Sequence, residues 1–124
     1  MRTVMTLLAA TLISGVALAS TMSTPDVSGI WDLEMTWGEG TRSTGVCTLE
    51  QEGETLTGTC GGAEKFGVKG SVENNRVSWK VAVEHEGGQG QMEFSGQLDE
   101  SGRTITGSCR IVGGQDGTFT LTRK

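Results

Sequence analysis

A regular alternation of apolar and polar residues restricts the folds open to this chain more than any other feature. In residues 31–37 every second residue is large and apolar, and the residues between them are charged or polar. Successive side chains point to opposite faces on an extended strand. The pattern therefore predicts a β-strand with one face in a core and the other in water.

The same pattern recurs in seven more segments. They are residues 47–50, 55–60, 66–72, 77–84, 92–98, 104–111 and 118–122. Residues 56–60 (LTGTC) are echoed by residues 105–109 (ITGSC), which indicates a repeated hairpin. Eight consecutive strands predict an all-β fold, an eight-stranded antiparallel up-and-down β-barrel, because closing the sheet removes both unpaired edges.

The connections between these segments are of two alternating kinds. Three are short and charged, with Gly or Asn residues that suit tight hairpins: 52–55, 73–76 and 100–103. Four are rich in glycine: 38–40, 61–62, 87–90 and 113–114. Alternate connections of a meander lie at opposite ends. We therefore expect a tight-turn end, formed by the first set, and a Gly-rich end, formed by the second.

The apolar faces of the strands define a predicted core. It is lined by Trp31, Leu33, Leu49, Phe66, Trp79, Val81, Phe94, Ile105 and Phe119. Four glycines share that face: Gly58, Gly70, Gly96 and Gly107. Two interpretations stay open, since the glycines either let the strands coil around bulky tryptophans or leave room for a ligand.

Residues 1–19 have the composition of a cleaved signal peptide. Arg2 precedes an apolar run, and Ala17-Leu18-Ala19 is a small-x-small cleavage site. The alternative is an uncleaved membrane anchor, but the run is short for a span. We expect a signal peptide at 1–19, a flexible N-terminal segment at 20–27 and a β-barrel domain at 28–124, in a periplasmic or secreted protein.

The charge of the chain narrows its range of partners. The 124 residues carry a formal net charge of −5, and loss of Arg2 with the leader takes this to −6. Nucleic acid and anionic membrane surfaces do not attract an acidic protein. An outer-membrane barrel would also have a leader and alternating strands, but these strands are short for a bilayer and no aromatic girdle is visible. We expect neither a nucleic-acid partner nor a membrane span after cleavage.

The three cysteines allow one disulfide in an exported protein. If a four-residue turn pairs Gln51 with Leu56, Cys47 and Cys60 become cross-strand neighbours on the inner face, close enough to bond. We predict this disulfide. Cys109 lies on a strand across the barrel, and we expect it to be a free, buried thiol.

The sequence contains no recognisable catalytic or metal-binding constellation. His85 is the only histidine, no His/Cys cluster has ligand spacing, and most acidic residues fall on the outer face. No glycine doublet is followed by a helix start, as a phosphate-binding loop requires. We expect a protein that is not an enzyme and that uses no cofactor or metal.

The Gly-rich end is the predicted binding site. An eight-stranded barrel is close to the size at which side chains alone fill the interior. If the large rings gather at the tight-turn end, an apolar cavity remains at the other. Its candidate ligand-binding residues are Met35, Trp37, Val83, His85, Met92 and Ile111. We expect an exported binding protein for a small, mostly apolar ligand, with a structural envelope protein that has a filled core as one alternative.

Several short motifs resemble avidin-type barrels and, more distantly, lipocalins. They are Gly29-Ile30-Trp31, Leu56-Thr57-Gly58-Thr59, residues 78–83 and Thr118-Phe119-Thr120. The resemblance implies the same barrel fold. It does not extend to biotin binding, because the positions matching the ligand-contacting residues of avidins hold Leu33, Trp37, Cys60 and Val83. A buried ureido group would lose about 1–3 kcal/mol for each hydrogen bond left unmade.

The start of the barrel, Ser28-Gly29-Ile30-Trp31, also resembles the small periplasmic inhibitors of bacterial metalloproteases. Those proteins are exported eight-stranded barrels with one disulfide and an N-terminal segment that enters the protease cleft. The resemblance implies that residues 20–27 are such an arm. Protease inhibition through this arm is therefore the second functional alternative.

Overall fold

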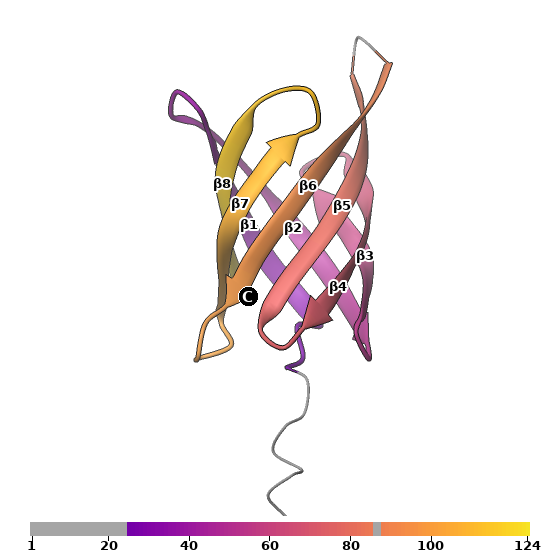
Figure 1. Ribbon diagram of the computed structural model, residues 1–124, viewed down its shortest axis with the longest axis vertical. Coiled ribbons are helices and arrows are strands. Elements are labelled where there is room, and N and C mark those ends of the chain that lie inside the picture. The colour runs from indigo at the N-terminus through magenta and orange to yellow at the C-terminus, as the bar shows by residue number, and fades with distance from the viewer. Residues whose placement is uncertain (1–24, 86–87) are drawn as a thin grey trace, which may run out of the picture.

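The computed structural model describes residues 25–85 and 88–124, and the side chains of all of these except 83–85, 88 and 89. They form eight strands that close into one barrel (Figure 1). The strands are β1 (Gly29–Trp37), β2 (Thr41–Glu52), β3 (Thr55–Gly61), β4 (Lys65–Glu73), β5 (Arg76–His85), β6 (Gly88–Leu98), β7 (Thr104–Ile111) and β8 (Asp116–Arg123). Each strand pairs antiparallel with the next and β8 pairs with β1, which confirms the predicted all-β up-and-down barrel.

The predicted signal peptide and residues 20–24 of the predicted N-terminal segment lie outside the described residues. Nowhere in residues 25–85 and 88–124 is there a helix with the length and hydropathy of a membrane span.

The second strand is longer than the alternation predicted. It begins at Thr41 instead of Cys47, because residues 41–46 pair along the whole upper half of β1, from Trp37↔Thr41 to Asp32↔Val46. This extension is polar and contains a glycine, so it lacks the apolar signal by which strands are recognised. Its hydrogen-bonded partner holds it in place, and the β1–β2 connection shrinks to a tight turn at residues 38–40.

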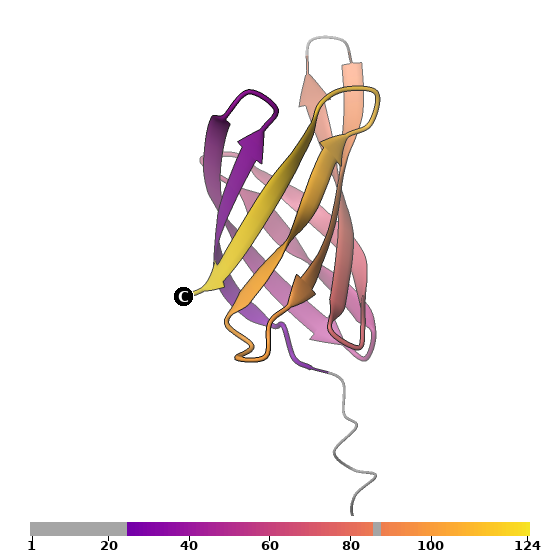
Figure 2. The ribbon, with the colours of Figure 1, turned by 60° about the vertical axis from the view of Figure 1, so that its left-hand side comes forward.

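The two ends of the barrel carry the predicted kinds of connection, but the Gly-rich loop predicted at 87–90 is wrong for residues 88–90, which pair with β5 as the start of β6. In Figures 1 and 2 the connections after β1, β3 and β7 lie at the upper end, and the turns after β2, β4 and β6 lie at the lower end. In the lower turns Gly53 and Asn74 have φ values of 63° and 58°. Glycine and asparagine adopt this left-handed conformation more readily than other residues, which is why these positions signalled hairpins in the sequence.

Two of the inward-facing glycines mark close approaches between strands. A β-carbon on Gly70 would collide with the carbonyl oxygen of Ser78 and lie 2.6 Å from the Cα of Trp79. At Gly58 the φ value is 144°, and a β-carbon would collide with the carbonyl oxygen of Thr48. A side chain fits at neither position, which supports the interpretation that these glycines let the strands coil.

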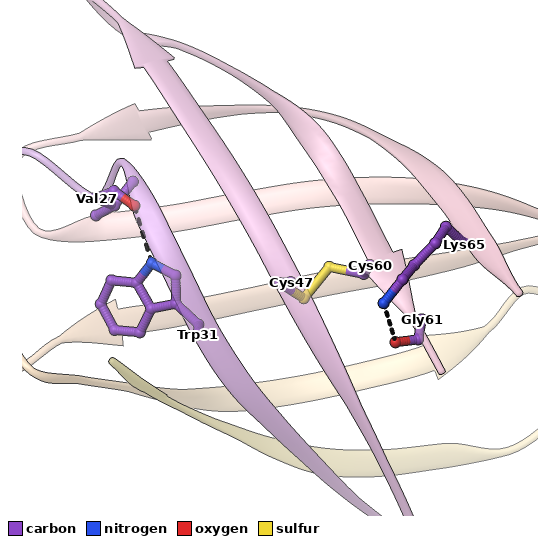
Figure 3. Close-up of a disulfide and its surroundings, with 6 residues drawn as sticks. All are labelled: Val27, Trp31, Cys47, Cys60, Gly61 and Lys65. Carbon is purple, nitrogen blue, oxygen red and sulfur yellow. Dashed lines mark hydrogen bonds between the residues drawn. A yellow bond between two sulfur atoms is a disulfide. The ribbon is translucent and has the colours of Figure 1, made fainter. Parts of the chain in front are cut away.

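Cys47 and Cys60 form the predicted disulfide between β2 and β3 (Figure 3). The register expected from the turn, Gln51 opposite Leu56, is present and makes the two cysteines direct partners. Their Cα atoms are 4.0 Å apart. Cys109 is buried and has no disulfide partner, as predicted.

Residues just before β1 close the tight-turn end. Val27 is fully buried, and its backbone N–H donates a hydrogen bond to Oε1 of Gln51 (2.8 Å). The Nε1 of Trp31 donates to the carbonyl of Val27 (3.0 Å; Figure 3). The guanidinium of Arg123 covers the Trp31 ring, 4.3 Å from its centroid. The core therefore extends into the segment that precedes the first strand.

Candidate functional site

The exposure of inward-facing side chains rises from the tight-turn end to the Gly-rich end. Leu56, Val72, Val77, Ile105 and Leu121, which lie toward the tight-turn end, are fully buried. Toward the Gly-rich end, four apolar side chains that pack against the core are only half-buried: Met35, Phe66, Met92 and Ile111. These four side chains are therefore partly accessible to solvent at the Gly-rich end of the barrel.

Three of the predicted ligand-binding residues line this open part. Met92 of β6 is the direct partner of Ile111 on β7. Met35 of β1 is the partner of Phe119 on β8. Cross-strand partners on one face of a sheet are within contact distance, so Met92 packs beside Ile111 and Met35 beside Phe119. We call the set of Met35, Met92 and Ile111 the apolar wall.

Of the remaining candidates, Trp37 has a described side chain, whereas Val83 and His85 are described only in their backbone. Trp37 is 8% exposed, and its ring covers Gly117, where a β-carbon would lie 2.8 Å from Cε3 of the indole. Trp37 therefore packs on the wall at the upper end of β1. Val83 and His85 lie on β5, but their side chains are outside the described part of the chain, so their place in the site stays a prediction.

Three aromatic rings form the floor below this wall. Trp79 is stacked on Phe94, with ring centroids 4.8 Å apart and planes 9° apart. Phe119 meets both rings edge-on, with centroids at 5.2 Å and 5.3 Å. All three rings are at least 96% buried. Offset and edge-to-face pairs of this kind are favourable beyond the area they bury, so the floor is well packed.

One polar atom of the floor has no partner. The Nε1 of Trp79 is buried and makes no hydrogen bond within the part of the chain that the structure describes. A buried donor without an acceptor is costly. The floor thus combines three apolar ring faces with a single unsatisfied donor.

Sequence reasoning missed two residues of the open end. Ser43 is half-buried and is the partner of Met35, on the same inward face as Cys47. The sequence does not indicate Ser43 because its segment lacks apolar alternation, although counting back from Cys47 in steps of two reaches it. The alternation predicts Phe66 in the core, but the residue is half-buried because it lies near the upper end of β4.

The chemistry of Cys109 does not suit a nucleophile. Its side chain is 2% exposed, and burial, together with the nearby carboxylate of Asp116, raises the pKa of the thiol to about 11. The reactive form of cysteine is the thiolate, which this pKa disfavours at neutral pH. Cys109 behaves instead as a small apolar residue beside Phe94, its partner on β6.

Two hollows lie on the outer surface, and the lining of the first also includes Trp79 and Phe94 of the floor. One, of about 670 Å³, lies over β4 to β8 and includes Glu93, which pairs with Arg110 (3.3 Å) and Lys80 (4.0 Å). The other, of about 770 Å³, lies over β8, β1, β2 and β3 and includes Asp32 and Glu34. Both are lined mainly by outward-facing side chains.

The comparisons with known proteins show the fold. No protein family and no curated protein matches the sequence. A redesigned β-barrel has a TM-score of 0.64 at 19% identity, over 82% of this chain and 96% of its own. The redesigned barrel mFAP1, bound to DFHBI, has a TM-score of 0.61 at 20% identity, over 78% of this chain and 94% of its own. EF1p2_mFAP2b, also bound to DFHBI, has a TM-score of 0.60 at 14% identity, over 89% of this chain and 100% of its own.

These similarities show the small eight-stranded barrel fold and give no match to avidins or lipocalins as families.

Proposed function

We propose that this chain is an exported, non-catalytic binding protein that takes a small, mostly apolar molecule into the Gly-rich end of its barrel. The observation that carries the proposal is the gradient of burial along the interior. Apolar side chains are sealed toward the tight-turn end and half-buried toward the Gly-rich end. A bound ligand would remove from water the apolar surface that is still exposed on Met35, Met92 and Ile111.

The energetics favour modest affinity for apolar molecules. Removing roughly 100 Å² of apolar surface from water contributes about 2.5 kcal/mol. Methionine side chains are flexible, so a site lined by them can accept several molecules of similar chemistry. Two barrels of similar architecture have DFHBI bound, and this supports small-molecule binding by a barrel of this kind.

Two features support export to the periplasm or beyond. The disulfide between Cys47 and Cys60 is of a kind that persists in oxidising compartments. The composition of residues 1–19 is that of a cleaved leader.

The contacts that hold residues 26–28 against the barrel favour protease inhibition through residues 20–27 less than ligand binding. Val27 is buried under the barrel, and Arg123 holds the carbonyls of Asp26 (3.0 Å) and Ser28 (2.8 Å). These residues would have to leave the barrel to enter a protease cleft. A structural protein with a filled core explains the packed floor. It does not explain why the inward-facing side chains of Met35, Met92 and Ile111 are only half-buried.

The test is a titration of the exported protein with DFHBI and with an environment-sensitive apolar dye, following tryptophan emission and dye emission. We expect saturable binding that Met92→Glu weakens at least tenfold, because a charge in the apolar wall opposes an apolar ligand. Gln91→Glu is the matched control, since Gln91 is the outward-facing neighbour on β6 and should leave binding unchanged.

Two results would contradict the proposal: no saturable signal with either probe, or equal loss of binding in both variants. Deleting residues 20–24 separates the alternatives, because it should abolish protease inhibition and leave cavity binding intact.

A further inference from the structure

The two most deeply buried tryptophans, Trp31 and Trp79, differ in whether the indole N–H has a hydrogen-bond acceptor. Trp31, at the tight-turn end, donates its indole N–H to the carbonyl of Val27 at 3.0 Å. Trp79, in the floor of the open site, is 2% exposed, and its Nε1 has no acceptor among the described residues. The fold therefore satisfies one indole and leaves the other with a buried donor that has no acceptor among the described residues.

The free donor is difficult to explain by packing alone. Phenylalanine would offer a ring to stack on Phe94 and to meet Phe119 edge-on, without burying an N–H group. A buried, unpaired donor costs roughly 1–3 kcal/mol, so an indole at this position gains only if an acceptor reaches it. A ligand in the barrel is a source of such an acceptor.

The position of Trp79 relative to the open end fits this role. Phe119, which contacts the Trp79 ring, is the β8 partner of Met35. Phe94, which stacks on Trp79, lies two residues from Met92 on the same inward face of β6. Trp79 therefore belongs to the surface on which a molecule inserted between Met35 and Met92 would rest.

The charge of the surroundings defines which acceptor fits. The buried core of the described residues contains no charged side chain. Arg123 covers the Trp31 ring at the tight-turn end, and its guanidinium is engaged with three backbone carbonyls. A carboxylate in the floor would lack a counter-ion and lose its hydration, whereas a neutral carbonyl needs one donor.

We propose that the indole N–H of Trp79 is the polar recognition element of the interior site, and that the ligand is an uncharged apolar ring compound whose buried end carries one carbonyl-type acceptor. This inference rests on the proposed function, since it names the class of molecule that the same site takes. The apolar wall supplies affinity, and the single donor fixes the orientation of the ligand.

The experiment compares two probes of the same shape, 2-acetylnaphthalene and 2-isopropenylnaphthalene, which differ in a carbonyl oxygen replaced by a methylene group. Both are titrated into the exported protein and into Trp79→Phe, and the indole N–H resonances are followed by ¹⁵N–¹H NMR. We expect the ketone to bind the unaltered protein about tenfold more tightly than the hydrocarbon. The variant should bind both probes equally and be at least as stable to urea.

The NMR readout separates donation by Trp79 from a general structural effect. The Trp79 N–H resonance, identified by its loss in Trp79→Phe, should shift with the ketone and much less with the hydrocarbon. The Trp31 resonance should stay in place because its hydrogen bond to Val27 is unaffected.

Equal binding of both probes to both proteins would overturn the role of Trp79 and leave the proposed function standing. If neither probe binds the unaltered protein, the proposed function itself is overturned.

Discussion

Replacing Arg123 with alanine should destabilise the barrel more than any other single change to a charged side chain. The guanidinium of Arg123 connects the last strand to the chain ahead of the first. Its Nη1 donates to the carbonyl of Ser28 (2.8 Å), its Nη2 to the carbonyl of Asp26 (3.0 Å) and its Nε to the carbonyl of Gly102 (3.1 Å). It also covers the ring of Trp31 at 4.3 Å.

The magnitude follows from these contacts. Hydrogen bonds from a charged donor contribute about 1.5–3 kcal/mol each when they are shielded from water. The bonds to Ser28 and Gly102 are partly buried, whereas the bond to Asp26 is exposed and counts for little. The cation–π contact adds about 0.5–1 kcal/mol. After allowance for water replacing part of each bond, we expect a loss of about 3 kcal/mol.

Urea denaturation monitored by tryptophan emission and far-ultraviolet circular dichroism measures this loss. A change of about 3 kcal/mol lowers the Tm of a domain of this size by at least about 10 °C. The emission of the folded variant should shift to longer wavelength, because Trp31 becomes accessible to water.

Two further variants make the experiment decisive. Arg123→Lys keeps the charge but not the planar fork of donors, so it should recover less than half of the loss. Arg76→Ala, at an exposed position of β5, is the control and should change stability by less than about 0.5 kcal/mol. If Arg123→Ala is as stable as Arg76→Ala, the contacts at the tight-turn end do not hold the N-terminal segment, and the reasoning is refuted.

Three more predictions test the interior. Gly70→Ala should cost at least about 1–3 kcal/mol, because its β-carbon would lie 2.6 Å from the tryptophan opposite, whereas Gly67→Ala on the same strand, with open space around its β-carbon, should be neutral; equal urea midpoints would contradict this. Replacing Cys47 and Cys60 together by alanine should cost roughly 3 kcal/mol in urea, as expected for a bond with a sequence separation of 13, and reducing agent should then have no further effect. The thiol of Cys109 has its pKa raised from 9.0 to about 11, so its contribution is fully present below pH 9 and is lost as pH rises toward 11, by about 2–3 kcal/mol; a Cys109→Ala variant with the same pH slope above 9 would contradict this.

Much of the barrel was predictable because the relevant physics is local. A side chain on a strand alternates between two faces, so the residues around Trp31 and Trp79 identify their own strands. Turn length sets hairpin register, and this alone brought Cys47 opposite Cys60. Local reasoning failed where the signal was absent: the polar start of β2, with Ser43, becomes a strand only because β1 lies beside it.

The candidate site was predictable only in part. Parity placed Met35, Met92 and Ile111 inside the barrel, and loop composition indicated which end they occupy. Nothing in the alternation distinguishes a sealed inward residue from a half-buried one. That difference depends on how far each strand extends and on what covers each end.

The sequence by itself thus determined the strands, their order, the inner and outer faces and the disulfide, since each depends on residues that are close together along the chain. The tertiary structure alone decided which end is sealed and which stays open. Val27 plugs the lower end because Arg123, which donates to the carbonyl of Ser28 across a separation of 95 residues, reaches it when β8 closes on β1. The free N–H of Trp79 likewise arises from ring packing among three strands. Contacts made by closure join residues with no local relationship, so no pattern of consecutive residues records them.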